Sequence, residues 1–272
     1  MPYSKQDIMK QLESLGAPTD KIVLMHSSLR SIGNVEGGAA TLLDALIEYF
    51  TKDGGLFCVP THTWHNLNQE ITLDMRSDST ALGAFSALAI QDGRGVRSEN
   101  PISSMVVFGN KEKAKAFIAD DAMITTATAP ESCYGKLFSN SGYVLLVGVA
   151  QNRNTYLHSV DEILHTSNRM KDEPIKVKVK RESGEVVERN LILYHSSFCS
   201  DISTRFVKYD TPFRYHKCIT DGYIGDAPTQ LCDAKKMKDV IELIYKNSDG
   251  NDPLETEQPI PPIWYCNKNN NA

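Results

Sequence analysis

The stretch YVLLVGVAQNRNTYLHSVDEILH, residues 143 to 165, joins an apolar run to a polar segment that carries two histidines and two acids. Apolar runs of the same kind occur at residues 21–28 (KIVLMHSS), 55–63 (GLFCVPTHT) and 105–109 (MVVFG). An uninterrupted apolar run predicts a strand that is covered on both faces. The four runs therefore predict a layered α/β fold, in which a mixed sheet lies between two layers of helices.

Helical patterns separate these runs. The segment from Ser4 to Gly16 has a serine suited to an N-cap and a glycine suited to the helix end. Residues 39–50 form a second helical pattern, which follows Gly37-Gly38. We also expect helices within residues 82–93 and 233–247, so helices and strands alternate along the chain.

Beyond residue 170 the pattern changes. Residues 175–193 (IKVKVKRESGEVVERNLIL) alternate apolar and charged side chains around a turn at residues 182–185, which predicts an antiparallel hairpin. No repeat or linker divides the chain. We expect one domain over residues 1–266 with this hairpin in its C-terminal half, followed by a frayed tail at residues 267–272.

Composition excludes several classes of protein. The chain has 272 residues, a hydrophobic content of 41% and a formal net charge of −5, without a basic block of the kind that binds nucleic acid. No apolar segment reaches membrane-spanning length and the N-terminus lacks a signal-peptide core, so we expect a cytoplasmic protein with no membrane partner. The six cysteines have no CxxC spacing and are expected to be reduced, mostly as small core residues.

Polar side chains follow three of the apolar runs. They lie at His26-Ser27-Ser28, at residues 61–65 (THTWH) and at residues 152–158 (NRNTYLH). Ligands of α/β sheets bind beyond the carboxyl ends of parallel strands. If the three strands are neighbours, these polar segments meet at one cleft.

His158 is the strongest candidate for chemistry in this cleft. Asn154 or Thr155 suits an N-cap, which places His158 in the first turn of a helix with Asp161 and Glu162 three and four residues later. A carboxylate that touched the imidazole would hold one ring nitrogen protonated and leave the other as a general base. Spacing alone nevertheless favours a plain solvated helix start.

Two other segments allow weaker interpretations. Residues 26–46 place hydroxyl side chains and Gly37-Gly38 before a helix, which suits a phosphate group but is found more often in an ordinary turn. His62, His65, His158 and His165 could supply metal ligands, although their spacing matches no standard zinc pattern. We therefore expect no metal. No GxSxG elbow is present, so a serine hydrolase has no visible nucleophile.

Taken together, five segments resemble the aminoglycoside 3-N-acetyltransferase family. They are residues 23–46, the loop after residues 55–64, residues 97–109, residues 132–164 and residues 221–227. The resemblance implies this family's α/β fold and the transfer of acetyl from acetyl-CoA to an amino group of an aminoglycoside, at the 3-N position. An acidic protein suits such a cationic small-molecule substrate. We expect direct transfer, because no residue stands out as a covalent carrier of the acyl group and Cys133, the nearest candidate, is discounted.

The resemblance assigns roles to named residues. The family's NTxLHxxE motif falls on residues 154–161, so His158 would be the base, Asp161 or Glu162 the acid that orients it, and Thr155 a donor to the thioester oxygen. The residues implied for CoA are Ser27, Ser28, Leu29, Arg30, Gly37, Gly38, Ala39, Arg97 and Ser104. Independently of the family motifs, we expect Asp74, Asp78 and Asp161 to be the acids that receive a cationic substrate.

The chain departs from the family pattern where relatives carry HPxHS, since residues 100–104 read NPISS and lack both histidines. Three alternatives therefore remain open. The acceptor could be a different small amine, the chain could bind CoA without turnover, or it could be a metal-dependent hydrolase that uses His62, His65 and His158.

Overall fold

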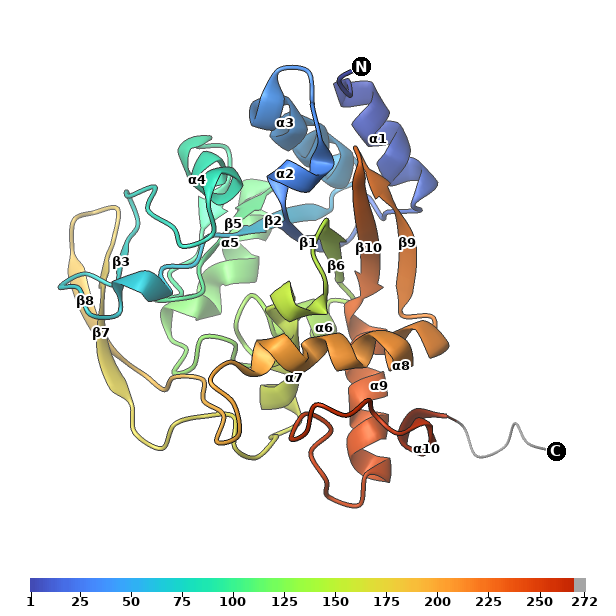
Figure 1. The fold of residues 1–272 in the computed structure, drawn as a ribbon. Coiled ribbons are helices and arrows are strands. Elements are labelled where there is room, and N and C mark those ends of the chain that lie inside the picture. Colours follow the sequence, from blue (N-terminus) through green and yellow to red (C-terminus); the bar gives the residue numbers. More distant parts are fainter. Residues whose placement is uncertain (267–272) are drawn as a thin grey trace.

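The computed structural model describes residues 1–266 and is built around one large mixed sheet (Figure 1). The frayed tail predicted for residues 267–272 lies outside the described residues. The large sheet has seven strands in the order β4-β5-β2-β1-β6-β10-β9. In chain order, these strands are β1 (Ile22–Ser27), β2 (Leu56–Pro60), β4 (Val96–Arg97), β5 (Met105–Phe108), β6 (Tyr143–Val147), β9 (Ile219–Ile224) and β10 (Ala227–Asp233).

Strand direction divides the sheet into a parallel centre and antiparallel edges. β1 pairs in parallel with both β2 and β6, so three of the predicted strands are neighbours as expected. β5 runs antiparallel to β2, and β10 runs antiparallel to β6. The carboxyl ends of the central strands β1, β2 and β6 therefore lie side by side at the same end of the sheet.

Helices cover both faces of the sheet (Figure 1). One face carries α1 (Lys5–Ser14), α2 (Leu29–Ile32), α3 (Gly38–Thr51) and α4 (Ala84–Gln91). The other carries α5 (Lys111–Ile118), α6 (Lys136–Ser139), α7 (Tyr156–Ile163), α8 (Asp210–Tyr215), α9 (Ala234–Asn247) and α10 (Pro262–Tyr265), with the 3₁₀ helix η4 (Ile202–Tyr209). Shorter 3₁₀ turns are η1 (Trp64–Asn66), η2 (Ala119–Ala122) and η3 (Gln151–Arg153). The predicted layers of helix, sheet and helix are confirmed.

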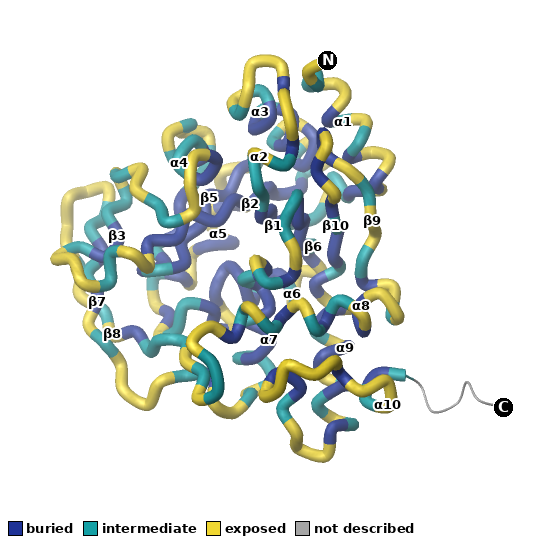
Figure 2. Tube along the Cα trace, in the orientation of Figure 1, coloured by how far each residue is buried: buried dark blue, intermediate teal, exposed yellow. Residues whose placement is uncertain are grey.

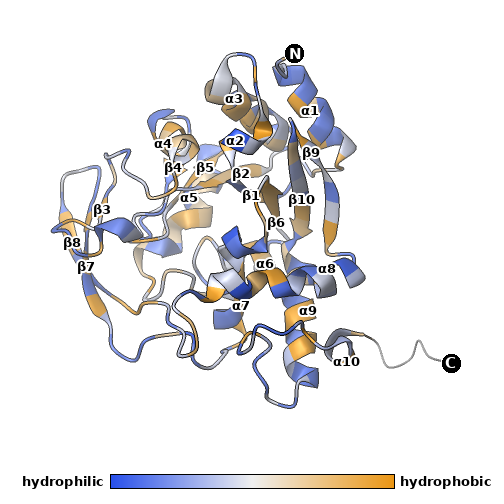
Figure 3. Ribbon diagram, viewed as in Figure 1, coloured by the Kyte–Doolittle hydropathy of each residue, from blue (hydrophilic) through white to orange (hydrophobic). Residues whose placement is uncertain are grey.

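Alternation along the central strands explains why the apolar runs are continuous. Val23 and Met25 of β1 pack into the core beneath α1 and α3, whereas Leu24 packs into the core on the opposite face. β6 repeats the pattern, with Val144 and Leu146 on one face and residues 145 and 147 on the other. The central strands are accordingly buried in Figure 2 and hydrophobic in Figure 3. Both cores need apolar side chains, so no polar position interrupts the run.

The predicted hairpin is present as β7 (Ile175–Lys180) and β8 (Val186–Leu191), which pair antiparallel. It forms a second sheet in the order β3-β7-β8, in which β3 (Leu73–Asp74) pairs in parallel with β7. Arg181 and Arg189 both reach Glu99, which lies just after β4, at 3.1 and 2.5 Å. These ion pairs connect the hairpin to the chain that leaves the large sheet.

Local sequence signals agree with the helix ends. The Ser4 hydroxyl accepts a hydrogen bond from the Asp7 backbone N–H while Asp7 accepts from Ser4, so α1 begins with a capping box. Gly16 has a φ of 68°, as its predicted place at the helix end requires. All six cysteines are free, and Cys58, Cys133, Cys218 and Cys232 are buried. Within residues 1–266, no helix is both long and apolar enough to cross a membrane.

Candidate active site

A cavity of about 520 Å³ opens beyond the carboxyl ends of β1, β2 and β6. His26 and Ser27 enter its wall from β1, His62 from the residues after β2, and residues 152–155 from the segment after β6. The polar ends of the three parallel strands therefore do converge. The remaining polar or charged wall is formed by Trp64, Ser86, Ser103, Thr128, His158, Glu162, Tyr194, Asp201 and Ser203.

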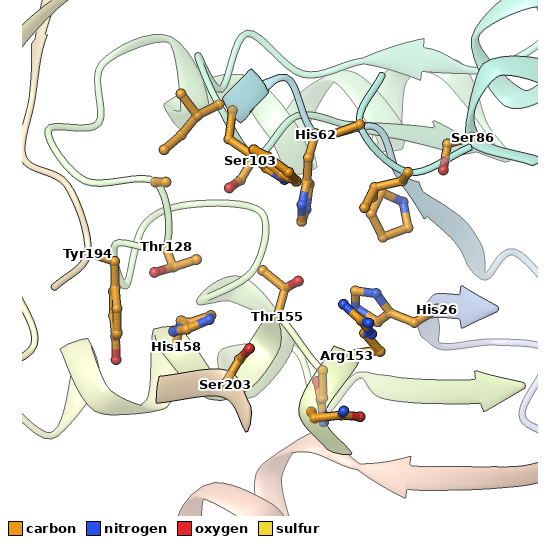
Figure 4. A pocket seen from close by; sticks show the side chains of 18 of the residues that line it. His26, His62, Ser86, Ser103, Thr128, Arg153, Thr155, His158, Tyr194 and Ser203 are labelled. Carbon is orange, nitrogen blue, oxygen red and sulfur yellow. The ribbon is translucent and has the colours of Figure 1, made fainter. Parts of the chain in front are cut away.

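His158 lies in the first turn of α7 and its ring faces the cavity (Figure 4). The rings of Tyr194 and Phe206 pack against it in T-shaped geometry, with ring centroids at 4.2 and 4.9 Å. Its Nδ1 is buried without a hydrogen-bond partner among residues 1–266. Burial lowers the pKa of this imidazole to about 4, while the charge of Asp201 raises it and that of Arg169 lowers it. The ring is therefore uncharged at neutral pH and can accept a proton.

The contact expected between His158 and an acid of the same helix is not present. Asp161 is buried and pairs with Arg169 at 3.0 Å, and it also accepts a hydrogen bond from the Tyr194 hydroxyl. Its carboxylate does not line the cavity, and the buried Arg169 that holds it also pairs with Asp252 at 2.8 Å. Burial raises the pKa of Asp161, while Arg169 and Tyr194 lower it. Asp161 contacts the Tyr194 hydroxyl, and the Tyr194 ring packs against His158.

Glu162 does line the cavity, but two threonines hold its carboxylate. Thr126 and Thr128 each donate a hydroxyl to one of its oxygens, the second at 2.5 Å. Burial raises the pKa of Glu162, and these hydroxyls lower it. The acid whose charge supports the His158 imidazolium is instead Asp201, which lines the same cavity. No sequence motif pointed to Asp201, because it lies in a loop after the hairpin.

Thr155 occupies the N-cap position of α7, yet its side chain makes no capping hydrogen bond. Its backbone is already helical, with φ −60° and ψ −25°, so the hydroxyl is not directed at the N–H groups of the first turn. Asn154 is buried and donates to the Gln151 side chain at 2.9 Å. The capping expected of either residue is therefore absent, and the Thr155 hydroxyl is available to the cavity.

The segment expected to bind CoA begins at the cavity and leaves it along the surface. Ser27 lines the cavity, whereas Arg30, Gly37 and Gly38 are exposed. Ser28 lies just before α2 and its hydroxyl pairs with that of Ser31 at 2.9 Å. The half-buried Leu29 and Ala39 complete the segment. Its path from cavity to surface suits a long substrate with a charged end, and the N-terminus of α3 lies at Gly38.

Arg97 and Ser104 lie behind the cavity wall. The buried Arg97 guanidinium donates to the carbonyl oxygens of Ser77 at 2.6 Å and Thr61 at 3.2 Å, and to the Ser104 hydroxyl at 3.3 Å. Burial lowers its pKa to about 10. These contacts hold the residues after β2 against the segment of residues 77–79.

Asp74 and Asp78, expected to receive a cationic substrate, do not line the cavity. Asp74 pairs with Lys180 of the hairpin at 3.0 Å. Asp78 accepts a hydrogen bond from Gln91 of α4 at 2.5 Å. Among residues 1–266, the carboxylates in the cavity wall are Glu162 and Asp201, and Arg153 is the lining cation.

Two further histidines enter the cavity beside His158. Burial lowers the pKa of both His26 and His62 to about 3. His26 Nε2 has no partner among the described residues, and His62 Nε2 lies 2.7 Å from the Tyr134 hydroxyl. The sequence pattern predicts both residues at strand ends, but it suggests a role for His62 only as a metal ligand. No three His, Cys, Asp or Glu side chains in the described part of the chain are arranged to hold a metal ion, and His65 contacts Ser79.

Cys133, the discounted acyl carrier, is fully buried, and burial raises the pKa of its thiol well above the usual value. It does not line the cavity. A thiolate is the nucleophilic form of cysteine, so this side chain is unsuited to carry an acyl group.

Known proteins with the same architecture identify the family. The model of a family described as aminoglycoside 3-N-acetyltransferase matches residues 24–245. A prophage-derived aminoglycoside N(3')-acetyltransferase-like protein of Bacillus subtilis, YokD, is 25% identical over 269 residues, which cover 92% of this chain and 94% of the relative. The structure of a variant of aminoglycoside acetyltransferase AAC(3)-IVa in complex with a gentamicin has a TM-score of 0.76 at 21% identity and covers 93% of both chains.

A second solved structure, AAC-IIIb binary with CoASH, has a TM-score of 0.73 at 21% identity and covers 88% of this chain and 94% of that chain. Both structures confirm the fold. The family model spans most of the sequence, including β1, β2, β6 and the helix that carries His158. This chain therefore belongs to the aminoglycoside 3-N-acetyltransferase family.

Proposed function

We propose that this protein transfers acetyl from acetyl-CoA directly to an amino group of an aminoglycoside, with His158 as the general base. One observation carries the proposal. In a member of this family, an uncharged imidazole lies in the wall of the cavity where three parallel strands end. A base in this place needs to be neutral before reaction, and burial among Tyr194 and Phe206 keeps it so.

The chemistry follows from a neutral His158. The amine nitrogen attacks the thioester carbonyl carbon while His158 takes one proton from that nitrogen. The tetrahedral intermediate then collapses, the carbon–sulfur bond breaks, and the imidazolium returns the proton to the CoA sulfur. Asp201 stabilises the transient imidazolium, since its charge raises the pKa of His158. The products are an N-acetylated amine and free CoA thiol.

The placement of acetyl-CoA rests on the segment from Ser27 to Ala39. Ser27 lines the cavity, and the exposed Arg30 and the start of α3 lie outside it. The thioester would enter beside β1, and the phosphates would lie near Arg30 and the first turn of α3. The structural relative AAC-IIIb with CoASH supports a CoA ligand for this fold.

The acceptor is an aminoglycoside by family membership and by the likeness to the gentamicin complex. A second candidate is a small amine with fewer charges. The charges of the cavity wall favour this candidate, because the wall has two carboxylates, Glu162 and Asp201, and one cation, Arg153. Asp74 and Asp78 lie outside the cavity. Few carboxylates are thus available to a polycation.

Release of CoA thiol tests both candidates. Purified protein would be given acetyl-CoA with a 2-deoxystreptamine aminoglycoside, and in parallel with a panel of mono- and diamines. Thiol release with the aminoglycoside, accompanied by a product heavier by one acetyl group, supports the proposal. Turnover with a small amine alone replaces the acceptor. CoA binding without turnover of any amine contradicts the enzymatic function.

A further inference from the structure

His62 is a buried side chain that the mechanism above does not use. It follows β2 and is 8% exposed, with its ring in the cavity wall. Its backbone is fixed, because its carbonyl oxygen accepts from the Ala81 N–H at 2.8 Å and from the Thr80 hydroxyl at 3.2 Å. The neighbouring Thr63 N–H donates to the Ile102 carbonyl at 2.9 Å. The ring is therefore held in place before any ligand binds.

The hydrogen bond to Tyr134 fixes which ring nitrogen carries the proton. Tyr134 is fully buried, and its hydroxyl has no partner within residues 1–266 other than His62 Nε2, at 2.7 Å. A buried hydroxyl hydrogen must be donated to an acceptor, and Nε2 is the acceptor within reach. Nε2 therefore carries no hydrogen, and the hydrogen of the neutral ring is on Nδ1. Burial keeps this ring neutral, since it lowers its pKa to about 3.

Nδ1 of His62 has no hydrogen-bond partner in the described part of the chain, and it is not fully enclosed by protein. It is a fixed donor in the wall of the cavity. Figure 4 shows His62 and His158 entering the cavity from opposite sides, with Thr155 between them in this view. The cavity thus presents a neutral acceptor on one side and a neutral donor on the other.

We propose that His62 Nδ1–H, together with the Thr155 hydroxyl, donates a hydrogen bond to the thioester carbonyl oxygen as negative charge develops there. This inference rests on the proposed acetyl transfer and adds a catalytic residue to it. The attacking amine loses its proton toward His158, whereas the carbonyl oxygen needs donors that lie away from that base. A neutral imidazole held by a tyrosine can supply one without adding a charge that would repel the cationic acceptor.

A matched pair of amides tests the role of Nδ1. The amide nitrogen of His62→Asn stands near the Nδ1 position and that of His62→Gln near the Nε2 position. His62→Ala is expected to lower kcat by about 10² to 10³-fold, with the KM values changed much less. His62→Asn should recover at least about tenfold of this loss, and His62→Gln should recover little. Thermal unfolding and CoA binding would show that each variant is folded.

Other kinetic outcomes overturn the inference. Equal activity of His62→Asn and His62→Gln would mean that a donor at Nδ1 is not needed. A raised KM for the acceptor with an unchanged kcat in His62→Ala would place the residue in acceptor binding. Tyr134→Phe provides a further check, because it removes the group that fixes the tautomer; kcat should fall while the protein stays folded.

A measurement that needs no turnover separates this inference from the proposed function. ¹⁵N NMR of histidine-labelled protein, assigned with His62→Asn, reports which nitrogen of His62 is protonated. We expect the hydrogen on Nδ1 and a downfield shift of its proton when S-acetonyl-CoA, a ketone analogue of acetyl-CoA, binds. A hydrogen on Nε2, or no shift with the bound analogue, contradicts the inference. Lack of thiol release by the wild type contradicts the proposed function, whereas the protonated nitrogen and its contact with the bound analogue are measured without turnover.

Discussion

His158 can act as a base near neutral pH because its surroundings keep it uncharged. Tyr194 and Phe206 remove its ring from water, which lowers the pKa, and Asp201 opposes this effect. A pKa of about 4 makes the imidazole a modest base, so catalysis depends on its position beside the amine as much as on its basicity.

Titration of the His158 ring tests this description. By NMR, with His158→Ala for assignment, we expect the ring of the free protein to titrate at about pH 4. Asp201→Asn should move the midpoint to lower pH, because the imidazolium loses the charge that stabilises it. A midpoint near 6.5, the ordinary value for histidine, would show that the ring is solvated and would contradict the account.

Single residues were the part of the site that sequence reasoning located least completely. His158, Thr155 and Ser27 line the cavity as expected, because each ends a strand or begins a helix at a position that local sequence defines. Tyr194 and Asp201 reach it from a loop with no motif. Asp161 has the right helical spacing but is drawn away by Arg169, a partner eight residues later whose position depends on tertiary packing.

Strands and helices were more predictable than side-chain contacts. β1, β2 and β6 follow from apolar runs, and the hairpin of β7 and β8 follows from alternation around a Gly-containing turn. The direction of β5 could not be read from its sequence, because a buried strand has the same composition in either direction. β9 and β10 were not identified as strands: β9 is largely exposed, and it therefore lacks an apolar run.

The ion pairs of the hairpin give a test at this level. Arg181 and Arg189 meet on Glu99, and Arg189 also donates to the Glu99 carbonyl at 2.9 Å. Glu99→Gln removes the shared charge, so amide hydrogen exchange in residues 175–191 should become at least several-fold faster while the large sheet is unchanged. The control is Glu188→Gln, which breaks the exposed pair with Lys176 at 2.7 Å and should have little effect. Equal exchange in both variants would mean that Glu99 does not anchor the hairpin.

The whole molecule brings three histidines to one enclosed place because the parallel strands share an edge. His26, His62 and His158 all have a lowered pKa, with burial as the main cause. Sequence pattern predicted both this convergence and the layered fold, since both follow from continuous apolar runs with polar ends. Burial of the rings could not be predicted, because it depends on helices and loops from distant parts of the chain. A single domain over residues 1–266 stays a prediction.

Buried neutral histidines make stability depend on pH. His26 becomes protonated below about pH 6.5 in the unfolded chain but only near pH 3 in the folded chain. The free energy of unfolding therefore decreases as the pH falls between these values. His26→Gln removes this loss. Between pH 6 and 4, the wild type should lose about 1.4 kcal/mol per pH unit more of its unfolding free energy than the variant does.

Urea unfolding of both proteins at several pH values measures this difference. The raised pKa values of Asp121, Asp161 and Glu162 act in the opposite direction, but they are common to both proteins and cancel in the comparison. Parallel curves for wild type and variant would show that His26 is solvated in the folded state.

The turnover of His158→Ala tests the central claim most directly. Thiol release from acetyl-CoA would be measured with the acceptor that the wild type uses, beside His195→Ala, which removes an exposed histidine outside the cavity. We expect kcat of His158→Ala to fall by about 10² to 10⁴-fold with little change in CoA affinity, and His195→Ala to match the wild type. An unchanged kcat in His158→Ala would remove this imidazole from the reaction and contradict the account.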